Sequence, residues 1–210
     1  MYRPSVSLAL LSLAACLASG SLHAAPAKPL AQTAVITPAS PQRLVDLDVS
    51  LKDAKELYLV ASSGGEISCD WANWIEPTLV MADGSRVDLT TLKWKSASAS
   101  YGKPQAAKSA GNAPLSVAGK VFAKGIGTHA DSVIAWQLPA GVERFQTKVA
   151  IDDGGMERGG APSDASIKFM VFTSAPPAPG MLAEDGPTEV PVDRFTLPED
   201  LEVTLWATTP

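Results

Sequence analysis

His129 is the one histidine that remains once an N-terminal leader is set aside, and it lies in the run Lys124–Asp131, KGIGTHAD. We expect Gly125 and Gly127 to serve backbone geometry, through a positive φ or the close approach of a neighbouring segment. A neutral imidazole could hydrogen-bond a ligand here, or it could be a buried side chain that fixes the loop through backbone bonds. No partner base, acid or second metal ligand stands beside it, so we favour the loop-organising role.

Asp152 and Asp153, with Glu157 nearby, are the acids whose spacing invites a hydrolytic interpretation. Hydrolysis of a glycosidic bond needs two facing carboxylates roughly 5–9 Å apart, one of them kept protonated by an apolar pocket. Adjacent residues at a strand end point to opposite faces, and the surrounding residues are not apolar. We therefore favour solvated loop acids, with a hydrolase as the weaker alternative.

Cys69 is the one thiol outside the leader, which also contains Cys16. A single cysteine forms no internal disulfide, and with His129 it cannot complete a closed zinc site. We expect Cys69 to be a small packing residue, because no second histidine is available to build a Cys–His pair.

The elements that must position these residues are β-strands. Apolar and polar residues alternate repeatedly, and no segment has a convincing helical period, which predicts an all-β sandwich or barrel. Pro77 indicates an edge strand or a bulge. Residues 95–113 and 152–163 are expected to be long loops, of the kind that is functional or disordered. The expected strands cover residues 43–51, 56–61, 75–80, 86–94, 114–122, 133–138, 145–151 and 165–173.

The first 24 residues have the pattern of an export signal, with Arg3 before an apolar run that is too short for a permanent membrane span. Cleavage after Ala24 would give a soluble periplasmic or extracellular protein, whereas lipidation at Cys16 would give an anchored lipoprotein. Both alternatives remain open. Residues 25–42 and 174–194 are rich in proline and read as linkers, and residues 195–210 read as the start of a truncated second domain.

The charge balance excludes some partners. Removing Arg3 with the leader lowers the 17 basic residues to 16, against 22 acidic ones, which gives a net charge of −6. The sequence shows no basic stripe, so nucleic acid and anionic membrane surfaces are poor candidates.

The run Lys124–Ala130, with Ile151–Asp153 and the Gly-rich loop after it, resembles the NPCBM family, the putative carbohydrate-binding module attached to family 98 glycoside hydrolases. Residues 92–97 with Tyr101-Gly102 are similar to the opening segment of that family, although Tyr101 stands where a tryptophan is expected. The resemblance covers about residues 43–173. Residues 195–210 faintly resemble the opening strand of bacterial membrane-bound dehydrogenase propeller domains.

The order of the segments departs from the family pattern. Residues 49–60, Gly64-Gly65 and 70–74 look like the family's closing strands, yet here they precede the opening segment. This indicates a circular permutation, which is feasible because the two ends of such sandwiches tend to lie close together.

The resemblance implies a jelly-roll-like, galactose-binding-like antiparallel β-sandwich that binds sugar through its loops and often holds a structural calcium ion. Sugar recognition needs an aromatic face and a few fixed polar groups. Trp136 is expected in the core, Trp71 and Trp74 could serve either role, and Tyr101 is expected to bind. Calcium takes oxygen ligands, so Asp70 or Glu76 is eligible. The predicted carbohydrate-binding set is Tyr101, His129, Trp71, Trp74, Asp152 and Asp153.

We accordingly expect a non-catalytic carbohydrate-binding module that holds an attached, exported enzyme near glycan. The alternative is an interaction or assembly domain at the front of a larger periplasmic sugar or alcohol dehydrogenase that no longer binds sugar.

Overall fold

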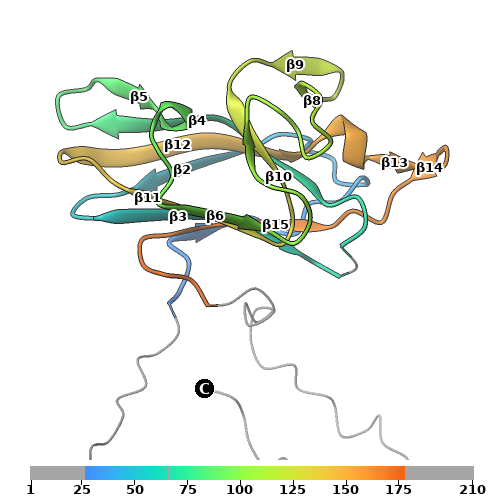
Figure 1. Cartoon of the computed structure of the whole chain (residues 1–210), viewed down its shortest axis with the longest axis horizontal. Helices are drawn as coiled ribbons and strands as arrows, with labels where there is room; N and C mark the ends of the chain where they lie inside the picture. The colour runs from blue at the N-terminus through green and yellow to red at the C-terminus, as the bar shows by residue number, and fades with distance from the viewer. Residues whose placement is uncertain (1–26, 66, 178–210) are drawn as a thin grey trace, which may run out of the picture.

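The computed structural model describes residues 27–65 and 67–177, and these form a jelly-roll-like antiparallel β-sandwich, as predicted. The two sheets lie face to face (Figure 1). The leader with Cys16, most of the 174–194 linker and residues 195–210 lie outside the described residues.

Sheet A has five strands, and every neighbouring pair in it is antiparallel. In spatial order they are β1 (Ala31–Gln32), β15 (Ile167–Phe172), β3 (Glu56–Ser63), β11 (Ser132–Gln137) and β6 (Ser96–Ala99).

Sheet B has six strands and is also antiparallel throughout. In spatial order they are β2 (Val45–Ser50), β12 (Val142–Ile151), β4 (Trp71–Met81), β10 (Gly125–His129) and β7 (Gln105–Ala106), and β5 (Arg86–Asp88) pairs with β4.

Two small hairpins and two 3₁₀ turns complete the described part of the chain. The hairpins are β8 (Leu115–Val117) with β9 (Lys120–Phe122), and β13 (Glu157–Arg158) with β14 (Ala161–Pro162). The turns are η1 (Leu89–Thr91) and η2 (Asp153–Gly155).

The core lies between the sheets. Trp74 of sheet B meets Phe169 of sheet A edge to face, with ring centroids 5.2 Å apart. Trp136 is fully buried, which confirms its predicted place in the core. Such rings bury 150–250 Å² each, so they contribute a large share of the hydrophobic stabilisation of the sandwich.

Pro77 marks a β-bulge, one of the two outcomes that the sequence predicted. The β4–β12 register shifts between Gln146 and Lys148, and Glu76 has a φ of 50°. Thr147 donates its hydroxyl to the carbonyl of Ile75 over 2.9 Å, which ties the two strands at the shift. The bulge lets a proline stand in a central strand without an unpaired ladder bond.

Three segments expected to be irregular contain strands. Residues 31–32 of the expected 25–42 spacer form β1, and Ile36 bridges Ile167. Buried Ile36 and Thr33 hold this segment against β15, which the proline-rich composition obscured. The 95–113 loop supplies β6 and β7, because edge pairing with β11 and β10 outweighs the weak strand propensity of its Ser and Ala residues. The 152–163 loop contains η2 and the β13–β14 hairpin.

Candidate functional site

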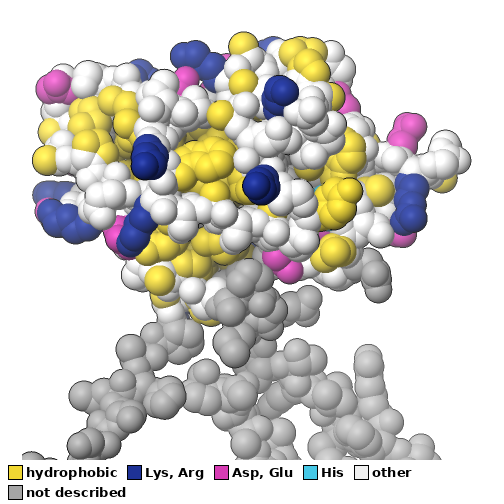
Figure 2. Space-filling model, viewed as in Figure 1, with side chains coloured by type: hydrophobic (Ala, Val, Ile, Leu, Met, Phe, Trp, Pro, Cys, Tyr) yellow, Lys and Arg dark blue, Asp and Glu magenta, His cyan; other side chains and the backbone are white. Residues whose placement is uncertain are grey.

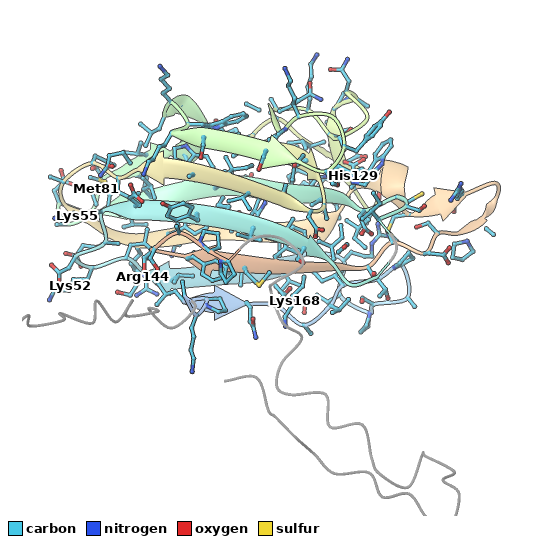
Figure 3. All side chains as sticks on the ribbon, turned by 60° about the horizontal axis from the view of Figure 1, so that its bottom comes forward. Lys52, Lys55, Met81, His129, Arg144 and Lys168 are labelled. Carbon is cyan, nitrogen blue, oxygen red and sulfur yellow. The ribbon has the colours of Figure 1, made fainter. Side chains whose placement is uncertain are left out.

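Three of the predicted site residues meet at one end of the sandwich. His129 of β10 and Trp71 of β4 are direct partners in the antiparallel ladder, so their side chains lie on the same face. The Tyr101 ring stands 5.7 Å from the imidazole, at 65° to it. Figure 3 shows His129 at the end of the sandwich opposite Lys52, Lys55 and Arg144. We call Trp71, Tyr101 and His129 the end site.

Tyr101 is the accessible ring of the end site. Its side chain is 71% exposed, whereas His129 is only 7% exposed and Trp71 is half-buried. An exposed aromatic ring on a surface loop has an apolar face available for the C–H groups of a sugar. The structure therefore shows Tyr101 exposed, and its role in binding stays a prediction.

His129 is held by its own loop. Its Nδ1 lies 2.6 Å from the carbonyl oxygen of Ala130, and because a carbonyl only accepts, Nδ1 carries the proton and donates. In the neutral ring Nε2 is then an acceptor. This bond to the backbone is the kind expected of a loop-organising histidine, and it fixes the tautomer that a sugar hydroxyl would meet.

Two glycines that the sequence analysis did not single out fix Trp71. A Cβ at Gly111 would lie 2.4 Å from Cη2 of the indole, and one at Gly154 would lie 2.3 Å from Cζ3. Neither site has room for a side chain, so the 107–113 loop and the 152–155 turn both rest on this ring. The glycine content of the two loops was the feature of the sequence that could have indicated this close packing.

Gly125 and Gly127 both permit the close approach of a neighbouring segment, as predicted. A Cβ at Gly127 would lie 2.2 Å from the carbonyl oxygen of Lys108, and one at Gly125 would lie 2.6 Å from the carbonyl oxygen of Trp74. Lys108 donates to the Asn112 side-chain oxygen over 2.9 Å on this crossing loop. Gly127 therefore lets the 107–113 loop, with its polar side chains, cross the sheet beside the end site.

Trp74 does not belong to the end site, and its prediction as a sugar-binding residue is wrong. Trp71 and Trp74 are both in β4, where residues three apart point to opposite faces. Trp74 accordingly points into the core, is fully buried and packs against Phe169. A ring without exposed surface cannot stack on a sugar.

Asp152 is a buried structural acid, not a solvated one. It is 2% exposed and accepts hydrogen bonds from Asn73 Nδ2 at 2.7 Å, the Ser116 N–H at 2.9 Å and the Gly154 N–H at 3.0 Å. Its carboxylate oxygens thus hold the core strand β4, the β8 strand and the η2 turn together. It has no face free for sugar.

Asp153 fastens the same hairpin from the other side. It accepts from the N–H groups of Ala118 and Gly119, each at 2.8 Å, and pairs with Arg43 at 3.1 Å. These bonds correct the expectation of solvated acids and the alternative of a hydrolytic pair, because both carboxylates are occupied by structural donors. The end site therefore consists of Trp71, His129 and Tyr101.

Asp70 and Glu76 cannot hold the same calcium ion. They stand six residues apart along an extended strand, a separation of roughly 20 Å. Asp70 is fully buried; one of its oxygens accepts from the Ser166 N–H at 2.7 Å and Oδ2 has no hydrogen-bond partner. Within residues 27–65 and 67–177, no three His, Cys, Asp or Glu side chains are grouped to hold a metal ion. Asp70 fits an oxygen ligand, but Glu76 does not join it.

Burial raises the pKa of Asp70 to about 7. The hydrogen bond from Ser166 lowers this pKa, and the negative charge of Asp131 raises it. Asp70 directly precedes Trp71, and its carbonyl oxygen accepts from the Ala130 N–H at 2.9 Å, so it lies under the end site. Protonation of Asp70 is consequently coupled to the stability of this end of the sandwich.

The antiparallel sandwich thus carries an exposed loop tyrosine, Tyr101, beside a strand histidine and a strand tryptophan at one end. The chain belongs to the NPCBM/NEW2 domain family, whose model matches residues 85–189, half of the chain. Modules of this family bind carbohydrate and are associated with glycosidases. No described helix is both long and apolar enough to cross a membrane.

One curated relative is alpha-1,3-galactosidase B of Akkermansia muciniphila. It is 38% identical over 76 residues, which is 35% of this chain and only 9% of that protein. No solved structure matches the chain significantly.

The family match begins at residue 85 and therefore leaves out β2, β3 and β4. β3 lies between β15 and β11 in sheet A, β4 lies between β12 and β10 in sheet B, and β2 pairs with β12 at the edge of sheet B. The strands within residues 85–189 need β3 and β4 between them to complete the two sheets and the core. A circular permutation would place these strands before the rest of the family sequence in this way. The permutation itself remains a prediction.

Proposed function

We propose that this module binds a sugar at the end site and does not act on it. The observation that carries the proposal is the exposed Tyr101 ring beside His129, whose Nδ1 is committed to the backbone. In this arrangement Tyr101 packs on the C–H face of a sugar ring, and Nε2 of His129 accepts a hydroxyl hydrogen bond. Lys108 and Asn112 on the crossing loop add polar groups at the rim.

The bonds of the two acids support a role without catalysis. The carboxylate oxygens of Asp152 and Asp153 accept hydrogen bonds from Asn73, the β8–β9 hairpin and Arg43. Neither carboxylate is therefore free to serve as a protonated acid or an attacking carboxylate. The module then holds an attached exported enzyme near glycan, a role supported by the family's association with glycosidases.

The galactosidase relative makes galactose-containing glycans the first ligands to test. A glycan array followed by calorimetry on the purified chain, with calcium present, tests the proposal. Saturable binding to one glycan class is expected. Absence of binding across the array would overturn sugar recognition.

Residues 195–210 support a second candidate, in which the module is an assembly domain at the front of a larger periplasmic dehydrogenase. The reading frame beyond Pro210 decides between the two, because a propeller with haem sites would favour the dehydrogenase and a glycosidase domain would favour glycan tethering. Export, by soluble release or through lipidated Cys16, is part of both proposals and is tested by locating the mature N-terminus by mass spectrometry.

We place the structural calcium ion that the family resemblance implies at Asp70 rather than at Glu76. Asp70 offers a buried, unpartnered Oδ2; burial is the main cause of its raised pKa, and repulsion from the charge of the nearby Asp131 raises it further. A cation would offset this repulsion between two carboxylates, and backbone carbonyls or water would supply the remaining oxygens.

A further inference from the structure

The three central strands of sheet A, β15, β3 and β11, carry apolar residues on both faces. Residues such as Leu59, Ile134 and Phe169 point into the sandwich, while their neighbours along the strands point outward. The outward set, which we call the outer patch, consists of Tyr58, Val60, Val133, Ala135, Met170 and Phe172.

The register joins the outer patch into two rows. Met170, Val60 and Val133 face one another across three strands, and so do Phe172, Tyr58 and Ala135. The outer face of sheet B is different where β2 and β12 present Asp46, Asp48, Gln146 and Lys148, with an Asp46–Lys148 ion pair and a hydrogen bond from Gln146 to Asp48. A sheet that is apolar on both faces is built to be covered on both.

Five of the six patch residues are 9% exposed or less, although they point away from the core. In the part of the chain that the structure describes, Ala27 is the apolar residue from outside sheet A that packs on the patch. One methyl group is too small to cover six side chains on three strands. The patch therefore calls for a further apolar segment.

Both ends of the described chain leave beside this patch. Leu30 donates its N–H to Val171, and Phe172 is the last residue of β15. Figure 1 shows the two ends emerging on the sheet A side, and Figure 3 turns the outer face of this sheet forward, with Lys168 labelled on β15. A segment that follows Pro177 starts next to the patch.

Met181 and Leu182 are the first large apolar residues after Pro177. Ten extended residues span roughly 30 Å, which is ample for the chain to fold back from Phe172. The family match continues to residue 189, so residues 178–189 belong with the module more than with a spacer. Glu184 and Asp185 follow directly, and their charge complements Lys168, which shares the outer face with Met170.

We propose that residues 178–183 fold back over the outer patch, with Met181 and Leu182 packed against it. The patch is thus the docking surface for the chain's own continuation, and it fixes the direction in which the chain leaves the module. This proposal is independent of sugar binding.

The test uses the full chain and compares Met181→Asp with Leu182→Asp, made together, against Val190→Asp with Val192→Asp. The control pair lies in the same expected linker, beyond the family match, makes the same change in charge and also replaces two apolar side chains. We expect the first pair to lower the thermal midpoint by several degrees and to raise binding of an apolar dye. The control should change neither, and glycan affinity should be unchanged in both.

A double-mutant cycle provides a second readout if the first pair does not fold. Val133→Ala and Leu182→Ala should be coupled by at least about twofold in the unfolding equilibrium constant, whereas Val133→Ala and Val190→Ala should be additive. Equal effects of the two Asp pairs, or no coupling, would overturn the proposal. A midpoint that rises with protein concentration would also overturn it, because a second copy would then cover the patch.

Discussion

His129 faces Trp71 directly across the β10–β4 ladder, and this pairing places an imidazole and an indole on one face at the end of the sandwich. Both rings are fixed from below, Trp71 by two glycines and His129 by the Ala130 carbonyl. Because the Trp71 and His129 rings are held in place beside the exposed Tyr101 ring, the site is preorganised, which lowers the entropic cost of binding.

Tyr101→Ala is expected to weaken glycan binding by about tenfold or more, because the only exposed ring of the end site is lost. Tyr101→Phe should retain most of the affinity if stacking is the main contribution. Calorimetry measures both. Val121→Ala removes another exposed apolar side chain and serves as the control; an equal loss there would show that the effect is not specific to the end site.

Gly111→Ala is expected to destabilise the protein by about 1–3 kcal/mol, because its Cβ would overlap the Trp71 indole. Displacement of the ring should also change the tryptophan fluorescence and reduce glycan affinity. Chemical unfolding and fluorescence spectra check this. Gly65→Ala is the matched control, since a Cβ there meets only Ser166 Oγ, at 3.9 Å.

Asp152→Ala is expected to cost about 2 kcal/mol or more in unfolding free energy, because Asn73 and the Ser116 N–H lose a buried acceptor. Hydrogen exchange should accelerate in the β8–β9 hairpin. Asp153→Ala should have a smaller effect, since this side chain is partly exposed. If either variant abolished a hydrolytic activity while leaving the hairpin protected, the structural role assigned to the pair would be wrong.

The stability of the protein should fall as pH rises from about 4 to about 7, through Asp70. The folded carboxyl has a pKa of about 7 against an ordinary value of 3.8, so the folded state holds an extra proton between these values. The contribution is on the order of 2–4 kcal/mol and becomes constant above the folded pKa. Asp70→Asn should remove this slope in urea titrations at pH 5 and 8, while Asp83→Asn, at an exposed turn, should keep it.

Chelation of calcium is expected to lower the thermal midpoint, and Asp70→Ala should abolish the difference between calcium and chelator. Glu76→Ala should leave it intact, because Glu76 lies too far along β4 to share the ion. Differential scanning calorimetry makes the comparison. An unchanged thermal midpoint of the unmodified chain on adding chelator would contradict the calcium site.

The sandwich was predictable because its signal is local. Alternation of apolar and polar residues defines strands such as 145–151 without knowledge of their partners. Pro77 indicated either an edge strand or a bulge, and the structure has the bulge. The edge strands were not predictable in this way. β1 and β6 are extended because they pair with β15 and β11, and nothing in their own composition favours a strand.

The site was predictable in part, since its residues were named but their directions were not. Placing Trp71 and Trp74 beside a turn left their roles open, whereas a single strand through both residues fixes them on opposite faces. Asp152 looked solvated because its donors, Asn73 and the Ser116 N–H, come from distant parts of the chain. The face on which a strand residue lies and its long-range hydrogen bonds depend on strand bounds and register, which the local sequence pattern does not reveal.

Lys and Arg side chains are scattered over the face shown in Figure 2 and form no continuous basic stripe there, which agrees with the poor prospects for nucleic acid as a partner. Hydrophobic side chains on that face gather in the band between the sheets and along the lower edge, beside sheet A.

The pairing of β1 with β15 also has a mechanical consequence. Leu30, Thr33 and Ile36 donate in turn to Val171, Phe169 and Ile167, and the two chain ends emerge from the same end of this short ladder. Tension applied between the ends would break these bonds one after another, as a zip opens, instead of loading them all at once. A tethered module could thus yield at its edge under pull while the Tyr101 end stayed folded.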